Sequence, residues 1–259
     1  MVSIQRRLHN SKKALREFDN LVENTSNVLL IHYSSESFYD KADGRSARIT
    51  SIAVRSFNTG QSESFSIHKT AEKEDLLSGI EAHYDKLEKI MLQDFFKFLK
   101  AHLKFKWIHW NMRDMGFGFQ AINHRFDVLG GKPTSIPDEN KFDLADKLKT
   151  IFGQDYIDHP RLEKIAKKND ISMKDFMNGV EEVAAFENKE YVKLHHSTLR
   201  KVNVMHSIAE KMIERSLKTE TKWYKKYGLT PQGIFEAIRE NWLFNLIIFL
   251  LGIFSAKIL

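Results

Sequence analysis

The hydrophobic positions of this chain predict one N-terminal helix, then several β-strands, and then mostly helices. Apolar residues recur on one face of residues 4–25, which predicts an amphipathic N-terminal helix. The continuous apolar run 27–33 (NVLLIHY) predicts a central strand, and residues 48–57 and 62–68 alternate well enough for two more. Because a turn sequence, NTG, separates the last two, these three strands are expected to form an antiparallel meander.

Helical spacing dominates the remainder of the chain. Residues 72–104 carry apolar side chains at helical intervals, whereas residues 105–110 (FKWIHW) read as a fourth strand that pairs beside the first. Further helices are expected over residues 114–128 with a stop at Gly130-Gly131, over 142–152, from Pro160, after a capping box at Ser172–Asp175, and over 188–218. A meander followed by a crossover into another strand predicts an α/β fold with a mixed sheet flanked by helices.

Composition narrows the class of protein. The chain has no cysteine, so disulfides and thiolate metal sites are excluded, and its N-terminus lacks the apolar segment of a secretory signal. We therefore expect an intracellular chain. A net charge of +6 fits an anionic partner, either nucleic acid or phospholipid headgroups. Because the basic residues are spread along the chain, a merely soluble basic protein is the alternative.

The C-terminus is the most apolar part of the sequence. A helix is expected to begin at Thr230-Pro231, and residues 242–259 carry one charge, Lys257. At ~1.5 Å per residue this segment spans about 27 Å as a helix, close to the hydrocarbon core of a bilayer. It is apolar all round, which predicts a single-pass membrane anchor. A buried core helix or an oligomerisation stripe is the alternative.

The flanks of this segment predict how it would sit in a membrane. Basic and aromatic residues precede it, namely Lys222, Trp223, Tyr224, Lys225, Lys226, Tyr227, Arg239 and Trp242. By the positive-inside rule they place the N-terminal domain on the cytoplasmic face, with a preference for anionic lipids. Lys257 would reach the headgroups, and Asn245 could bond to a second copy in a homo-oligomer.

Residues 26–216 resemble the ribonuclease H-like superfamily, specifically the DnaQ-type 3′–5′ exonucleases. The resemblance rests on element order and on four segments, IHYSSE from Ile31, WNMRD from Trp110 followed by GFGF, FDL from Phe142, and YVKLHHSTLRK from Tyr191. The family carries Asp-x-Glu on its first strand, an Asn-x-x-x-Asp type motif after its fourth, and a His-x-x-x-x-Asp or Tyr-x-x-x-Asp motif on a late helix. The resemblance implies two divalent cations held by these carboxylates.

This sequence departs from that carboxylate set. The Asp-x-Glu positions align with His32 and Ser34, and the last acidic position, five residues after His196, is Lys201. Asp114 follows Asn111 one residue too soon. We therefore expect a catalytically degenerate exonuclease-like domain. The alternative is an active enzyme with a displaced site.

Three sets of side chains carry the remaining chemistry. A displaced nuclease site would use Glu36, Asp114, Asp143 and His196 with magnesium or manganese. Zinc or manganese binding by His32, His109, His195 and His196 is a further alternative to ordinary packing. Nucleic acid is expected at Lys104, Lys106 and Arg113, near an aromatic run that is either a stacking surface or core, namely Phe95, Phe96, Phe98, Phe105, Trp107 and Trp110.

These features predict an N-terminal helix over residues 1–25, an exonuclease-like domain over 26–218, and a C-terminal helix over 231–259. The first hypothesis is a degenerate module that binds nucleic acid or a protein partner on a membrane anchor. Such a layout is typical of a membrane-acting effector, for example in antiviral defence. The second is a membrane-bound metal-dependent exonuclease, and the third is a soluble helical scaffold with a buried C-terminus.

Overall fold

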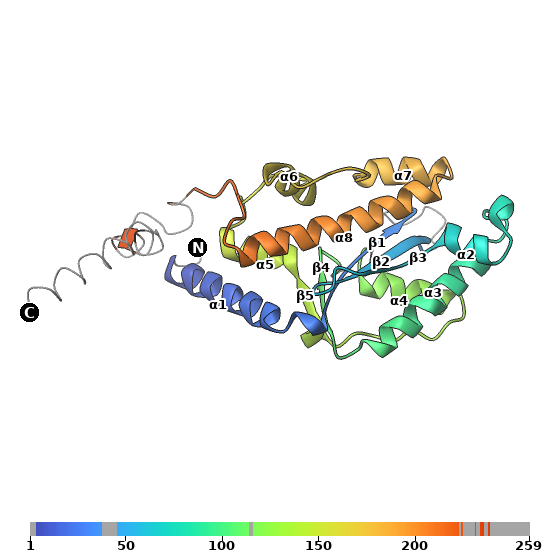
Figure 1. Cartoon of the computed structure of the whole chain (residues 1–259), viewed down its shortest axis with the longest axis horizontal. Coiled ribbons are helices and arrows are strands. Elements are labelled where there is room, and N and C mark those ends of the chain that lie inside the picture. The colour runs from blue at the N-terminus through green and yellow to red at the C-terminus, as the bar shows by residue number, and fades with distance from the viewer. Residues whose placement is uncertain are drawn as a thin grey trace, which may run out of the picture.

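A mixed five-stranded sheet organises the described part of the chain (Figure 1). The computed structural model describes residues 4–37, 46–113 and 116–222, with five single residues beyond them, Tyr224, Pro231, Ile234, Phe235 and Ile238. The strands are β1 (Val28–Ser35), β2 (Ile49–Ser56), β3 (Ser62–Ser66), β4 (Lys106–His109) and β5 (Lys141–Asp143). Their order is β3-β2-β1-β4-β5. Neighbours are antiparallel from β3 to β1 and parallel from β1 to β5. The predicted meander, the fourth strand beside the first and the mixed α/β fold are confirmed.

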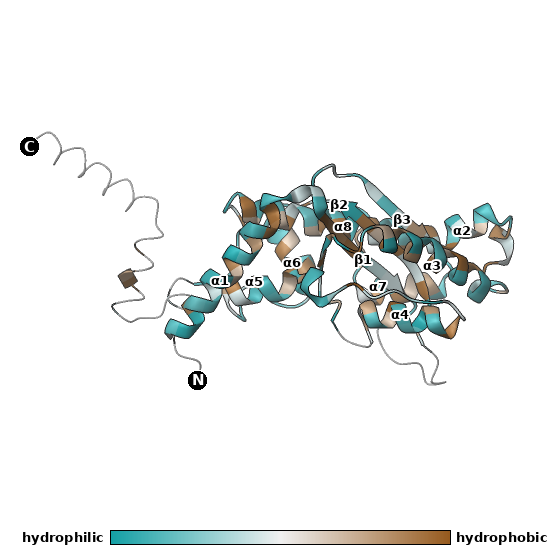
Figure 2. Cartoon of the chain, turned by 90° about the horizontal axis from the view of Figure 1, so that it is seen from below, coloured by the Kyte–Doolittle hydropathy of each residue, from teal (hydrophilic) through white to brown (hydrophobic). Residues whose placement is uncertain are grey.

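Helices cover both faces of the sheet. Those of the described residues are α1 (Ile4–Glu23), α2 (Ile67–Lys73), α3 (Tyr84–Ala101), α4 (Phe119–Val128), α5 (Leu144–Phe152), α6 (Arg161–Lys168), α7 (Gly179–Glu187) and α8 (Tyr191–Ile213), with short 3₁₀ turns at Thr25–Asn27, Leu77–Gly79 and Asp138–Asn140. The long helix α8 packs across β1 and β2, and α1 packs against α5. In Figure 2 the helices carry hydrophilic residues outward, while hydrophobic residues gather toward the sheet.

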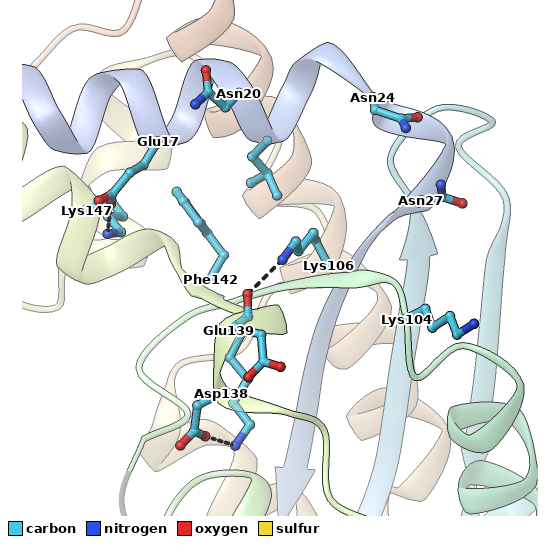
Figure 3. Close-up of a pocket in the computed structure, with 12 residues that line it drawn as sticks. Glu17, Asn20, Asn24, Asn27, Lys104, Lys106, Asp138, Glu139, Phe142 and Lys147 are labelled. Atoms are coloured by element: carbon cyan, nitrogen blue, oxygen red, sulfur yellow. Dashed lines mark hydrogen bonds and ion pairs between the residues drawn. The ribbon is translucent and has the colours of Figure 1, made fainter.

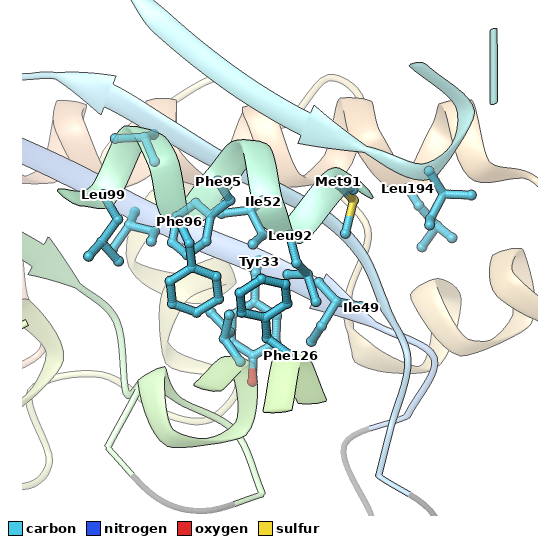
Figure 4. Close-up of a cluster of buried hydrophobic side chains, with 14 of the residues drawn as sticks. Tyr33, Ile49, Ile52, Met91, Leu92, Phe95, Phe96, Leu99, Phe126 and Leu194 are labelled. Atoms are coloured by element: carbon cyan, nitrogen blue, oxygen red, sulfur yellow. The ribbon is translucent and has the colours of Figure 1, made fainter. Parts of the chain in front are cut away.

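The central strand explains why the sheet has two cores. Every residue of β1 is buried, and successive side chains point to opposite faces. Leu29, Ile31 and Tyr33 join a core with α3 and α4, shown in Figure 4. Val28 and Leu30 join a second core with α1, α5, α6 and α8. Continuous apolarity in the sequence therefore marks a strand covered on both sides.

The aromatic run belongs to these cores. Phe95, Phe96, Trp107 and Trp110 are buried, and the remaining two rings, Phe98 and Phe105, are half-buried against the first core. The packing interpretation is thus confirmed, and this run offers no open stacking platform among the described residues.

The single helix predicted over residues 72–104 is wrong. The structure divides it into α2, a 3₁₀ turn and α3. The chain leaves α2 through Asp75, whose φ is +56°, and the amide of Leu76 closes the turn by donating to the carbonyl of Ala71 at 2.8 Å. Leu77, one of the apolar positions that supported a continuous helix, is 55% exposed. Apolar spacing alone did not reveal that the chain must turn there to bring α3 back onto the sheet.

Other boundaries were predicted with mixed success. The stop at Gly130-Gly131 is confirmed, since Gly130 has φ of +71° and the Gly131 amide donates to the Phe126 carbonyl at 2.8 Å. The helix after Pro160 is also confirmed as α6. The capping box at residues 172–175 is wrong, because the cap belongs to Asn178, which exchanges hydrogen bonds with Glu181 at the start of α7.

Three further predictions placed helix starts too early, and one strand was missed. Helix α4 begins at Phe119 rather than residue 114, and α8 covers 191–213 rather than 188–218. The helix predicted from residue 142 begins at Leu144, because the residues before it form β5. A three-residue strand has no periodicity of its own, and only its pairing with β4 defines it.

The predicted membrane segment lies outside the described residues. The same holds for Trp223, Lys225, Lys226, Trp242, Asn245 and Lys257. Within the described ranges, no helix combines the length and the apolarity needed to cross a bilayer.

Candidate functional site

Three positions that the sequence analysis compared with the exonuclease motifs come together in the structure. His32 lies on the face of β1 that α8 covers, Asn111 follows β4, and Lys201 lies on α8. These residues line one cavity of about 250 Å³ at the carboxyl end of β1. His32 and Lys201 stand where the motifs have acids, whereas Asn111 keeps the motif's residue type, and the sheet and α8 bring the three positions together.

A buried acid, Glu182 of α7, stands at the centre of the adjoining polar network. Its Oε1 atom accepts hydrogen bonds from the Ser34 and Ser197 hydroxyls at 3.0 and 2.8 Å. The Lys201 ammonium forms an ion pair with the same oxygen at 2.6 Å. Glu182 is 0% and Lys201 5% exposed, so this charge pair is fully removed from water.

Hydroxyl groups extend the network under α8. Thr198 Oγ1 lies 2.8 Å from Ser34 Oγ and 2.5 Å from Ser51 Oγ, and it donates to the Leu194 carbonyl at 2.9 Å. Ser34 and Ser51 pair across β1 and β2. The network therefore ties two strands to α7 and α8 at the end of the sheet where the cavity opens.

His32 is the polar group of the cavity whose hydrogen bonds are incomplete. It is 5% exposed, and neither ring nitrogen has a hydrogen-bond partner among the described residues. Burial, with the Lys201 charge nearby, holds the pKa of His32 well below its usual range, so the imidazole is neutral. A buried polar group without a partner costs about 1–3 kcal/mol, which makes this position unusual for a purely structural residue.

The described residues that line this site do not fit a pair of magnesium ions. Hard divalent cations require several carboxylate oxygens, whereas Lys201 places an ammonium where the resemblance expects an acid. The nearby carboxylate, Glu182, is already neutralised by that ammonium, and Ser34 is bound to the same acid. Two added cations would meet a positive charge rather than ligands.

Glu36 and Asp143 of the displaced site occupy different places. Leu30 pairs with Ile108, which pairs with Phe142. Glu36 is six residues past Leu30 and Asp143 one past Phe142, so Glu36 lies about 16 Å further along the sheet at ~3.3 Å per residue. Glu36 accepts a hydrogen bond from the Arg48 amide at 3.2 Å.

Asp143 has a structural environment at the end of β5. Its carboxylate caps α5 by accepting from the Asp146 amide at 3.2 Å, and it pairs with Arg113 Nε at 2.7 Å. His196 is exposed on α8, and Asp114 lies outside the described residues. The structure therefore does not bring the three described members of this set together.

The four histidines considered as metal ligands are distributed over the sheet and α8. His109 accepts from the Met112 amide at 3.2 Å, and burial lowers the pKa of His109 to about 4. His195 lies beside His68, with ring centroids 5.0 Å apart, and burial lowers the pKa of His195 to about 3. No group of three metal-ligating side chains occurs within the described ranges.

The three basic residues considered for nucleic acid line two adjoining pockets, which share Asp138 and Lys141. Lys104 and Lys106 line a cavity of about 550 Å³ between α1 and β5, shown in Figure 3, whereas Arg113 lines another of about 360 Å³. Lys106 donates to the Glu139 carbonyl at 2.8 Å and to Asn140 Oδ1 at 2.9 Å. Arg113 is held by Asp143 and Asp146. These side chains do not form one continuous basic surface.

Acidic groups balance the larger of these two pockets. Lys141 pairs with Asp138 at 2.7 Å, and Lys147 pairs with Glu17. In Figure 3 Lys104 is drawn apart from these pairs, near the start of β4. The pocket therefore presents mixed charge rather than the excess of positive charge that a phosphate backbone selects.

Sequence reasoning missed Glu182 and the hydroxyl network. Ser34, in the first motif, and Lys201, in the last, were each visible as departures from the acids that the resemblance expects. Nothing in the run GVEEVAAFE distinguishes Glu182 from the exposed Glu181, because both lie in the first turn of α7. Only the packing of α7 against β1 buries Glu182 and leaves Glu181 exposed, where it bonds to the helix cap.

The mixed sheet and this cavity define an α/β protein with a buried, charge-neutral polar site. No family model, curated protein or solved structure matches the chain.

Proposed function

We propose that this chain is a binding module on a ribonuclease H-like, exonuclease-like scaffold that has lost two-metal chemistry, and that its C-terminal segment anchors it to a membrane. The cavity at the end of β1 is the recognition site. The binding of a ligand there controls what the anchored chain does at the membrane, as in a membrane-acting effector. Nucleic acid and a protein partner are the two macromolecular classes that remain open for the module as a whole.

The convergence of His32, Asn111 and Lys201 carries this proposal. The sequence alone assigns these three positions to the family's motifs, and all three line one cavity. The order of strands also agrees with the element order on which the resemblance was drawn. Because the motif positions share a cavity but two of them carry other residues than the expected acids, we favour ligand binding over hydrolysis.

Electrostatics explain why hydrolysis is disfavoured. Two-metal cleavage depends on cations that stabilise the attacking and leaving oxygens of the phosphate. Among the described residues at this cavity, the acids Glu182 and Glu163 are already paired with Lys201 and Lys167, so neither is free to hold such cations or to activate water. The described lining presents a neutral imidazole and aromatic and aliphatic side chains beside two amides, Asn111 and Asn178, which are groups that bind rather than cleave.

The full chain in detergent micelles is expected to leave single-stranded DNA and RNA intact in the presence of magnesium or manganese. Oligonucleotide length on a denaturing gel is the measurement. Asp114→Ala and Asp143→Asn serve as matched variants, because Asp114 belongs to the predicted displaced site and Asp143 has a structural role in α5. Metal-dependent shortening that disappears in Asp114→Ala would instead establish the exonuclease alternative.

The membrane proposal concerns residues 242–259. We expect the full chain to stay with the membrane fraction after alkaline carbonate washing. Placing arginine at the centre of the segment, as in Leu250→Arg, costs about 2.5–3.5 kcal/mol of insertion free energy and is expected to shift the protein toward the supernatant. Lys257→Arg keeps its charge and is the control. Release of the unaltered chain by carbonate would refute the anchor.

A further inference from the structure

The cavity at the end of β1 has a small volume and an aromatic lining. It is bounded by side chains from β1, the segment after β4, α6 and the segment before α7, including Phe117, Phe176 and Met177. Phe117 lies 5.9 Å from the His32 ring and stacks on Tyr33 with centroids 4.6 Å apart. At about 250 Å³ the cavity is smaller than the roughly 300–1,000 Å³ of pockets for drug-sized ligands. One ring system fits it better than a chain of several units.

The charges that line the cavity are already paired. The Lys201 ammonium is bound to Glu182 at 2.6 Å. Glu163, the acid at the rim, pairs with Lys167 at 2.5 Å. An anionic phosphate would have to compete with the Glu182 carboxylate for Lys201. A cationic ligand that paired with Glu182 would leave the Lys201 ammonium buried without a counter-ion. Charge balance therefore selects an uncharged ligand.

His32 supplies the hydrogen-bonding groups for such a ligand. A neutral imidazole has one nitrogen that donates and one that accepts, and neither of those of His32 is used by the described residues. Flat rings with polar edges, which stack on aromatic side chains and present donors and acceptors in their plane, match both features.

We propose that this cavity binds a single uncharged heteroaromatic ring of nucleobase size, held by hydrogen bonds to His32 and packed against Phe117 and Phe176. The proposal rests on the proposed function in one respect, that the site binds rather than cleaves. The ligand is recognised through its ring and not through a phosphate, so the free base or nucleoside is sufficient for binding.

The test uses the full chain in detergent micelles, titrated with adenine, cytosine, uracil and the corresponding nucleosides. Binding is followed by calorimetry and by tryptophan fluorescence, since Trp110 lines the cavity. At least one base is expected to bind, and its nucleoside to bind comparably. Inorganic phosphate is expected neither to bind nor to compete.

Variants identify the groups responsible. His32→Phe preserves a flat ring but removes both nitrogens, and it is expected to weaken binding roughly 10- to 100-fold. His32→Gln retains a donor and an acceptor and is expected to retain part of the affinity. The control is His206→Phe, since His206 is also a buried histidine but contacts the Phe57 carbonyl, away from the cavity. Its affinity should equal that of the unaltered chain.

Three results would overturn the ligand assignment. They are no binding of any base or nucleoside at millimolar concentration, equal binding by His32→Phe and the unaltered chain, and binding of oligonucleotides without binding of nucleosides. None of them affects the proposal that the module lacks nuclease activity. Conversely, metal-dependent shortening of oligonucleotides would refute the proposed function whatever the result of the base titration.

Discussion

Arg125→Met is expected to destabilise the chain by about 3–5 kcal/mol, because it leaves Glu88 as a buried acid without its partner. Arg125 of α4 is 4% and Glu88 of α3 is 0% exposed. The guanidinium donates to Glu88 through Nε at 3.0 Å and Nη2 at 2.6 Å, and the Ile49 amide donates to the same carboxylate at 2.6 Å. This pair connects α3 and α4 to the first residue of β2.

The stability lost in Arg125→Met should depend on pH. Burial raises the pKa of Glu88 to about 7, against the lowering effect of its hydrogen bonds from Arg125. The unfolded chain releases this proton near pH 4.5, so between pH 4.5 and 7 the native state binds more protons and the stability from this group falls as pH rises. Removing Arg125 raises the pKa of Glu88 further. The variant is therefore expected to lose most stability at pH 8 and least at pH 5.

Urea unfolding of the full chain at these two pH values measures the effect. Arg215→Met is the matched control, because Arg215 also contacts both oxygens of an acid, Asp19, but that pair is exposed. It is expected to cost less than about 1 kcal/mol. Equal losses in the two variants would show that burial does not determine the strength of the Arg125–Glu88 pair.

Lys201→Met is expected to cost a similar 3–5 kcal/mol, because it leaves the Glu182 carboxylate without its counter-ion inside the protein. The methionine side chain fills most of the space of the lysine stem, so the loss reports the charge rather than a cavity. The remaining hydrogen bonds to Glu182, from Ser34 and Ser197, do not neutralise it.

A double-variant cycle separates this pairing from general damage. Glu182→Gln keeps an oxygen that accepts from the two hydroxyls while it removes the charge. Combined with Lys201→Met, it is expected to restore a large part of the stability lost in the single variant. Lys168→Met, at an exposed pair with Glu220, is the control. If the stability lost in the double variant equals the sum of the losses in Lys201→Met and Glu182→Gln, the two side chains do not stabilise each other.

The local elements of this fold could largely be predicted from the sequence. The buried run at β1, the alternation of β2 and the glycine stop after α4 each depend on residues close together in the chain. The division of residues 72–104 could not be predicted, because the turn at Asp75 is imposed by the packing of α3 on the sheet. The same is true of β5, whose three residues become a strand only through their pairing with β4.

The candidate site could be predicted only in part from the sequence, and the rest required the tertiary structure. The sequence by itself determined that His32, Ser34 and Lys201 stand where the resemblance expects acids, since residue identity and spacing are properties of the chain alone. Only the tertiary structure decided that Lys201 meets Glu182, that the His32 nitrogens find no partner among the described residues, and that Glu36 and Asp143 lie apart. Glu182 and Lys201 are 19 positions apart in the sequence and become partners through the packing of α7 and α8. Burial then strengthens the interaction between their charges, and a local sequence pattern cannot predict burial of this kind.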